Sequence, residues 1–272
     1  MSYPHIAAPI AAVHTLFNVI TTVLFLPFSK QFARLVEYVI KADAAEKPHL
    51  SALKMTPWLS PIIACDQVLL EVQFMRDSDL ELLAGVKDVL TGNASERAEA
   101  HILHREDVLD NVQREVTEFL GRVIVKRSPT DVALRVKRLM RLSDELESVS
   151  DEAADIVKAA RRLRKGGQNF SDVSLKALLS VHNRVMPFAH GISEYVKSPR
   201  PEFNLLAIQT ESGKLATCIR ATRQGQLNRV GPDDPTSPLR VLAELDILNA
   251  YDRIRSCYLN IAETLAGGKT AT

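Results

Sequence analysis

The sequence has no surplus of charge of either sign. Its 34 Lys and Arg residues are balanced by 33 Asp and Glu residues, for a formal net charge of +1. Proteins that bind nucleic acid neutralise its phosphates with an excess of basic residues on one face, and no basic tail or stripe supplies one here. Nucleic acid is therefore not expected as a partner.

Cysteine, glycine and proline are also scarce. The three cysteines, Cys65, Cys218 and Cys257, are far apart and in no CxxC or Cys/His spacing, which predicts reduced thiols in a cytoplasmic domain and no structural zinc. Glycines and prolines gather between apolar-periodic stretches, and the alternation of β-branched residues typical of strands is missing. The composition predicts an all-α chain.

Enzyme signatures are missing as well. None of the seven histidines falls in an HExxH pattern, and there is no P-loop, GxSxG or glycine-rich nucleotide turn. We therefore expect the chain not to be an enzyme.

One long uncharged run is present, from Ile6 to Phe28. At about 1.5 Å per residue it reaches roughly 34 Å, enough for a ~30 Å hydrocarbon layer. No Lys or Arg precedes the run, and several follow it, which orients its C-terminal side toward the cytoplasm. The run predicts a transmembrane helix, with a buried helix of a soluble core as the alternative.

Polar side chains recur at helical spacing within this run: His14, Asn18, Thr21 and Thr22. Polar groups are costly against lipid, so this face should meet other helices or a water-filled path. Interhelical hydrogen bonding and a role in ion or substrate passage both remain open. Either reading requires partner helices.

The stretch Ala11–Phe28 resembles the end of the second transmembrane repeat of bacterial sodium/phosphate cotransporters, where His-Thr-Leu-Phe-Asn leads into Phe-Leu-Pro-Phe. The resemblance implies an inner-membrane location, transporter transmembrane helices as partners, and inorganic phosphate and sodium handled by the intact transporter. It also implies a PhoU-like domain after the helix. The family's serine-rich transport segments are missing, so we expect that this chain alone does not move phosphate.

The rest of the chain divides into two sets of three helices. Apolar periodicity predicts helices near 61–91, 95–126, 129–165, 171–197, 202–230 and 237–266. The breaks between them carry helix stop and start signals such as Gly92 with Asn93 and Gly166 with Gly167. The expected organisation is a transmembrane helix with its extension (1–40), a linker (41–60), two repeats (61–167 and 168–266) and a disordered tail (267–272).

The third and sixth predicted helices carry matching apolar seams. In the third, Leu142, Leu146, Val149, Ala153, Ile156 and Ala160 recur at spacings of three and four. A shift of 105 residues places Ile247, Tyr251, Ile254, Tyr258, Ile261 and Leu265 on them. The pattern predicts an internal duplication of a three-helix unit.

A stripe of carboxylates lines the third helix: Asp144, Glu147, Asp151 and Asp155. Like charges one turn apart repel by roughly 0.2–0.5 kcal/mol per pair, so helix stability alone does not favour the stripe. It is either a solvated acidic surface or a site for a divalent or ferric cation, since hard cations take several carboxylate oxygens.

The segment DELESVSDEAADI (144–156) resembles the PhoU repeat signature, in which a Glu and an Asp four residues apart contribute to metal binding. This carries over to Glu147 and Asp151. The segment HREDVLDNVQREVTEFL (104–120) resembles the companion helix and implies Glu106 and Asp110 as co-ligands. In the second repeat, the 105-residue shift places Asn249, Asp252, Ser256 and Asn260 on the stripe, so we expect metal on the first repeat only.

Two functions follow as hypotheses. The first is a C-terminal segment of a sodium-dependent phosphate cotransporter whose PhoU-like cytoplasmic domain regulates transport through surface metal binding. The alternative is a membrane-tethered PhoU-like module that acts on a phosphate-signalling kinase or a separate permease. Self-association, metal identity and the direction of transport are left open.

Overall fold

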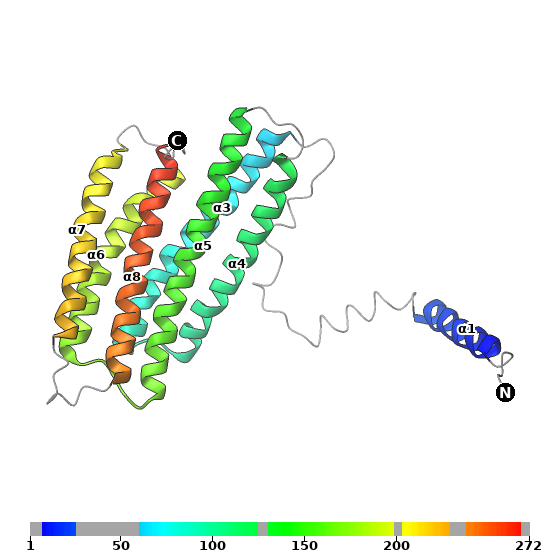
Figure 1. The fold of residues 1–272 in the computed structure, drawn as a ribbon, viewed down its shortest axis with the longest axis horizontal. Helices are drawn as coiled ribbons and strands as arrows, with labels where there is room; N and C mark the ends of the chain where they lie inside the picture. Colours follow the sequence, from blue (N-terminus) through cyan, green and yellow to red (C-terminus); the bar gives the residue numbers. More distant parts are fainter. Residues whose placement is uncertain (1–6, 26–59, 125–129, 199–202, 229–237, 268–272) are drawn as a thin grey trace. The chain divides into compact units, whose positions relative to one another are not determined.

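The computed structural model describes residues 7–25, 60–124, 130–198, 203–228 and 238–267 (Figure 1). The regular structure of these residues is entirely α-helical, which confirms the predicted fold class. The helices are α1 (Ala7–Phe25), α3 (Pro61–Thr91), α4 (Glu96–Ile124), α5 (Thr130–Lys165), α6 (Asp172–Lys197), α7 (Leu205–Leu227) and α8 (Pro238–Leu265). The chain separates into two compact units, Met1–Lys47 and Pro48–Thr272.

Local chemistry sets the helix ends close to their predicted positions. Pro61 lies at the start of α3, and Gly92 ends this helix with a φ of 75°, a left-handed conformation that glycine adopts without a Cβ penalty. The Ser171 side chain accepts a hydrogen bond from the Ser174 N–H at 3.2 Å and caps α6. Asn204 caps α7 by accepting from the Ala207 N–H at 3.1 Å. The side chains that satisfy the free N–H groups at the starts of α6 and α7 therefore lie next to those groups in the sequence.

The second unit is a bundle in which α5 and α8 form the most extensive helix pair. In Figure 1, α5 and α8 occupy the middle of the bundle, with α4 beside α5 and α7 beside α8. Three polar contacts show that α5 and α8 run antiparallel. They join Asn260 to Glu145 at 3.0 Å, Arg253 to Glu152 at 2.8 Å, and Arg162 to Asp246 at 3.1 Å.

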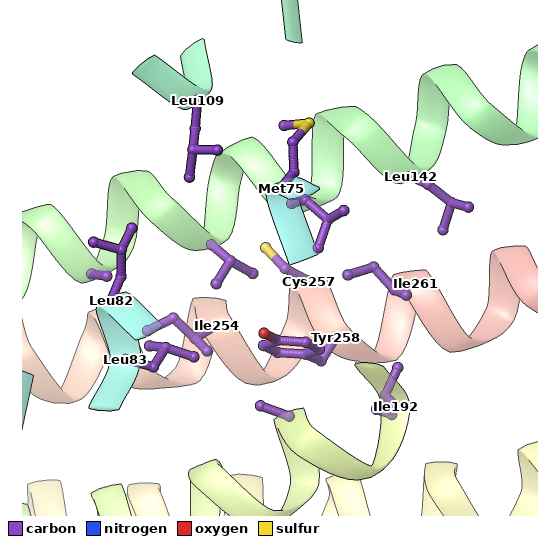
Figure 2. Close-up of a cluster of buried hydrophobic side chains, with 14 of the residues drawn as sticks. Met75, Leu82, Leu83, Leu109, Leu142, Ile192, Ile254, Cys257, Tyr258 and Ile261 are labelled. Atoms are coloured by element: carbon purple, nitrogen blue, oxygen red, sulfur yellow. The ribbon is translucent and has the colours of Figure 1, made fainter. Parts of the chain in front are cut away.

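The core lies along the two predicted seams. Leu146, Val149 and Ile156 of α5 and Tyr251 and Ile254 of α8 are fully buried. Figure 2 shows how α3 completes this core: Met75, Leu82 and Leu83 lie among side chains of α8, with Leu109 of α4 above and Ile192 of α6 below. Because apolar area is removed from water on every helix of the bundle, the seam is packing and not a cofactor site.

The first unit contains α1, whose side chains are described from Val13 to Thr22. Val13, Leu16, Phe17 and Ile20 are 50–67% exposed. The polar residues bond to each other, because Asn18 Nδ2 donates to His14 Nδ1 at 3.1 Å. Of the other two predicted polar residues, Thr21 is half-buried and Thr22 is exposed.

The predicted helix in the Ile6–Phe28 run is present as α1, but its assignment as a membrane span is not supported. Among the described residues, no helix combines the length and the apolar character that a membrane crossing requires. Within α1 the apolar residues are interrupted by His14 and Asn18. Positions 26–28 of the run lie outside the described residues, as do nearly all of the predicted linker (41–60) and tail (267–272).

Candidate functional site: a carboxylate cluster between α4 and α5

Helical spacing brings four predicted carboxylates to one interhelical surface. Glu106 and Asp110 lie one turn apart on α4, and Glu147 and Asp151 lie one turn apart on α5. We refer to these four residues as the carboxylate cluster. The α4 and α5 helices pack against each other, so the two pairs face a common region.

The carboxylates of the cluster lie close enough for their charges to affect one another. The pKa of Glu147 is raised to about 7, first by burial and then by the charges of Asp151 and Asp110. The pKa values of Glu106 and Asp151 are also raised, chiefly by burial, although Lys158 opposes both shifts. Like charges in a half-buried place disfavour ionisation, so the cluster favours uptake of a proton or a cation.

A buried carboxyl group lies behind the cluster. Asp79 of α3 is completely buried, and neither of its carboxyl oxygens has a hydrogen-bond partner among the described residues. Burial raises the pKa of Asp79 well above its usual value, and the charge of Glu147 raises it further. An isolated buried carboxylate is costly to keep ionised, so burial favours the neutral form of Asp79.

The two outer carboxylates of the predicted stripe have other partners. Gln113 Nε2 on α4 donates to Asp144 at 2.6 Å. Lys158 lies 3.4 Å from Asp155 and 3.8 Å from Glu106, and so connects the stripe to the cluster. Asp144 and Asp155 are exposed, whereas Glu147 and Asp151 are half-buried. The structure therefore divides the predicted stripe into a sheltered central pair and two solvated ends.

The chemistry of the cluster suits a hard cation, but its side chains are not preassembled around one. Carboxylate oxygens from two helices are the donors that Mg²⁺, Mn²⁺, Ca²⁺ and ferric iron prefer. Within the described part of the chain, no group of three or more His, Cys, Asp or Glu side chains is placed to hold a metal ion. Binding would require the carboxylates to turn toward one point.

A second polar region borders the cluster. A groove of about 480 Å³ lies between α5 and α8; it shares Asp155 with the stripe and is also lined by Lys158. Across this groove Arg253 reaches Glu152 at 2.8 Å and Arg162 reaches Asp246 at 3.1 Å. Its charges are thus matched between the two helices, and the groove serves chiefly to join α5 to α8.

The corresponding face of α8 is chemically different. Asp252, which matches Glu147 under the 105-residue shift, accepts a hydrogen bond from Arg255 Nε at 2.8 Å. Asn260, which matches Asp155, donates to Glu145 of α5. Asn249 is exposed, and Ser256 is half-buried. The second repeat therefore has one carboxylate here, and an arginine already pairs with it.

Comparison with known proteins found a family similar to this region. Residues 72–160 match the PhoU domain model. This part of the chain is therefore similar to a PhoU domain. The matched residues include all four carboxylates of the cluster and Asp79. None of the curated proteins compared with the chain matches it.

Two solved structures share the PhoU fold with this chain. The crystal structure of PhoU from Pseudomonas aeruginosa has a TM-score of 0.66 at 16% sequence identity, and the match covers 76% of this chain and 97% of that one. The structure of the phosphate transport system regulatory protein PhoU from Streptococcus pneumoniae has a TM-score of 0.62 at 14% identity, covering 78% and 98%. The PhoU-like fold thus extends well beyond the matched segment 72–160.

Sequence reasoning missed Asp79 and Arg255. Asp79 stands at helical spacing from Met75, Leu82 and Leu83, on the buried face of α3, and this spacing is the signal that could have located it. The sequence did not single out Arg255, because pairs of opposite charge three residues apart, such as Asp252 and Arg255, are common on helix surfaces. One signal could have drawn attention to Arg255: the position 105 residues earlier, in the first repeat, holds the small residue Ser150.

Proposed function

We propose that this chain regulates phosphate transport through its PhoU domain, by docking on a transport protein and not by catalysis. The observation that carries the proposal is the PhoU match over residues 72–160, the segment that contains the carboxylate cluster. The Streptococcus pneumoniae protein with a similar fold is named as a phosphate transport system regulatory protein. A shared fold alone does not fix function, so the weight rests on the matched segment together with its cluster.

The finer part of the proposal concerns attachment. We infer that α1 packs against helices of a sodium/phosphate transport protein in the bacterial inner membrane, with the helical bundle in the cytoplasm. Two features support this: the resemblance carried by Ala11–Phe28, and the exposed apolar side chains of Val13, Leu16, Phe17 and Ile20. Exposed apolar surface of this kind is typical of an interaction site. The polar pair His14 and Asn18 would then hydrogen-bond across the helix interface.

The proposed regulatory signal is a cation at the carboxylate cluster. A cation held by Glu106 and Asp110 of α4 and by Glu147 and Asp151 of α5 would relieve the repulsion that raises the pKa of Glu147. Because its ligands belong to two helices, binding would fix α4 against α5 and change the surface that a partner meets. The ion would contribute positive charge, and the carboxylates of the two helices would contribute the oxygens that coordinate it.

The partner is the decisive test of the function. A photo-crosslinking residue in place of Phe17, introduced into the full chain in cells, should capture a phosphate transport protein, and the same substitution at the bundle residue Leu134 serves as a position control. Capture of a kinase or of a separate permease would instead support the membrane-tethered signalling module. If deletion of the chain leaves phosphate uptake unchanged at both low and high external phosphate, the proposed function is wrong.

A further inference from the structure

The outer helix of the second helix set, α7, is held by few buried side chains. The buried residues of α7 are Ser212, Leu215, Ile219 and Gln226. Leu206, near its start, is 72% exposed. Leu215 and Ile219 are the buried aliphatic side chains of α7, and Leu205 and Ile208 pack against the core while partly buried, so polar contacts add to a modest apolar attachment of α7.

One such contact joins α7 to α8 through Arg255. The guanidinium group donates from Nε to Asp252 on its own helix at 2.8 Å, and from NH1 to Ser212 Oγ on α7 at 2.8 Å. The side chain of Arg255 is only 14% exposed, and Ser212 is 1% exposed. Hydrogen bonds from a charged donor in a sheltered place are among the stronger ones in proteins.

The surface around Arg255, between α7 and α8, differs in charge from the matching surface of the first helix set. Here α8 corresponds to α5 and α7 to α4, and Asp252 corresponds to Glu147. In the first set, the surface between the two helices holds four carboxylates, and among the described residues the ion pair that reaches them comes from Lys158 at its edge. In the second set, Asp252 is the carboxylate on the matching surface, and the guanidinium of Arg255 on the same helix neutralises it.

We propose that Arg255 is a permanent internal cation, which holds α7 on α8 and thereby limits any response to added cations to α4 and α5. The proposal deepens the proposed function and rests on it only for the response of α4. A guanidinium is always charged and cannot dissociate as a metal ion does, and its planar donors join two acceptors at once. The second half of the bundle is then the fixed half, and the first is the adjustable one.

Hydrogen exchange of the full chain, read helix by helix by mass spectrometry, tests this arrangement. In the Arg255→Met variant, amides of α7 should exchange about tenfold faster, because a charged hydrogen bond between α8 and α7 is lost. Added Mn²⁺ should not restore them. Arg255→Lys keeps the charge but has fewer donors in fixed positions, so its exchange should be intermediate. The matched control is Lys214→Met, which removes an exposed cation of α7 that pairs within the helix with Glu211 and should leave exchange unchanged.

The outcomes separate the two proposals. If Arg255→Met leaves α7 exchange unchanged, or if Mn²⁺ slows α7 exchange in the wild type, the internal-cation proposal is wrong. If Mn²⁺ fails to slow α4 exchange in the wild type, the cation part of the proposed function is wrong, and the α7 comparison still decides the role of Arg255. Should Arg255→Met not fold, Ser212→Ala removes only the α7 acceptor and should give faster exchange confined to α7; unchanged exchange there would overturn the proposal.

Discussion

His182 of α6 and Tyr251 of α8 are joined by a buried hydrogen bond, with Nδ1 of the imidazole 3.0 Å from the phenol oxygen. The two rings lie edge to face. Burial and the nearby charge of Lys87 lower the pKa of His182 to about 4. The pair satisfies two polar groups that would otherwise be costly in the core.

The neutral state of His182 predicts acid sensitivity. An unfolded histidine titrates near pH 6.5, so between about pH 6.5 and 4 the unfolded chain binds more protons than the folded one. The contribution of His182 to stability is therefore complete above about pH 6.5 and is lost as the pH falls toward 4, by roughly 3 kcal/mol in all. Urea unfolding of wild type and His182→Gln across this range should show a shallower pH dependence in the variant. The exposed His190→Gln should behave as wild type, and an equal slope in all three proteins would contradict the assignment.

Glu147 predicts the opposite pH dependence over a similar range. Its folded pKa is about 7, above the value near 4.5 of an unperturbed Glu, so the folded state binds more protons between these values and loses stability as the pH rises through them. Glu147→Gln should be more stable than wild type at about pH 8, by on the order of 1 kcal/mol after solvent screening. The difference should vanish near pH 4.5. Glu118→Gln, an exposed change on α4, is the control, and a Glu147→Gln protein that is less stable at pH 8 would contradict the prediction.

Cation binding should depend on the first helix set alone. The double variant Glu147→Gln with Asp151→Asn should lose most bound cation, because affinity rises with the number of anionic oxygens. Asp252→Asn should leave binding unchanged, because Asp252 is already paired with Arg255. Calorimetric titration with Mn²⁺, Mg²⁺ and Ca²⁺ and elemental analysis for iron and zinc measure this. Absence of uptake by the wild type, or equal losses in both variants, would show that the cluster is an acidic surface only.

The bundle should fold without the first unit. A fragment that starts at Pro48 retains the whole second compact unit, including every helix that builds the core. It should be helical and should unfold in a single cooperative transition in urea, because one hydrophobic core joins all its described helices. Circular dichroism and fluorescence should give coincident transitions. An aggregated product, or transitions that differ between the two probes, would show that residues before Pro48 contribute to the core.

Local chemistry made the helices predictable, and tertiary packing made part of the site unpredictable. Gly92, Ser171 and the pair Gly166 and Gly167 mark ends that depend on neighbouring residues only, and the predicted boundaries agree with the structure to within about three residues. The spacing within each helix likewise put Glu106 with Asp110 and Glu147 with Asp151.

Helical spacing does not specify how the helices of the site pack against one another. The complete burial of Asp79 depends on how α3 packs inside the bundle, and the reach of Arg255 to Ser212 depends on where α7 lies. The spacing puts Asp79 on the buried face of α3 but does not show which helices cover it, and it does not show where Ser212 lies. The assignment of the Ile6–Phe28 run as a membrane span rested on the length of an uncharged run, and it stays a prediction, since no helix among the described residues has the length and apolar character of a span.

The pairing of α5 with α8 has a consequence for how the protein is made. The largest interface in the bundle joins the middle of the chain to its last helix, so α5 leaves the ribosome long before its main partner exists. Until α8 is synthesised, the side of α5 that α8 covers is exposed to water or to another chain, whereas α3 and α4 are already available to the rest of α5. Contacts between distant segments are also slow to form, because a long loop must close first. The interval between synthesis of α5 and release of α8 is therefore the period in which a nascent chain most needs a chaperone.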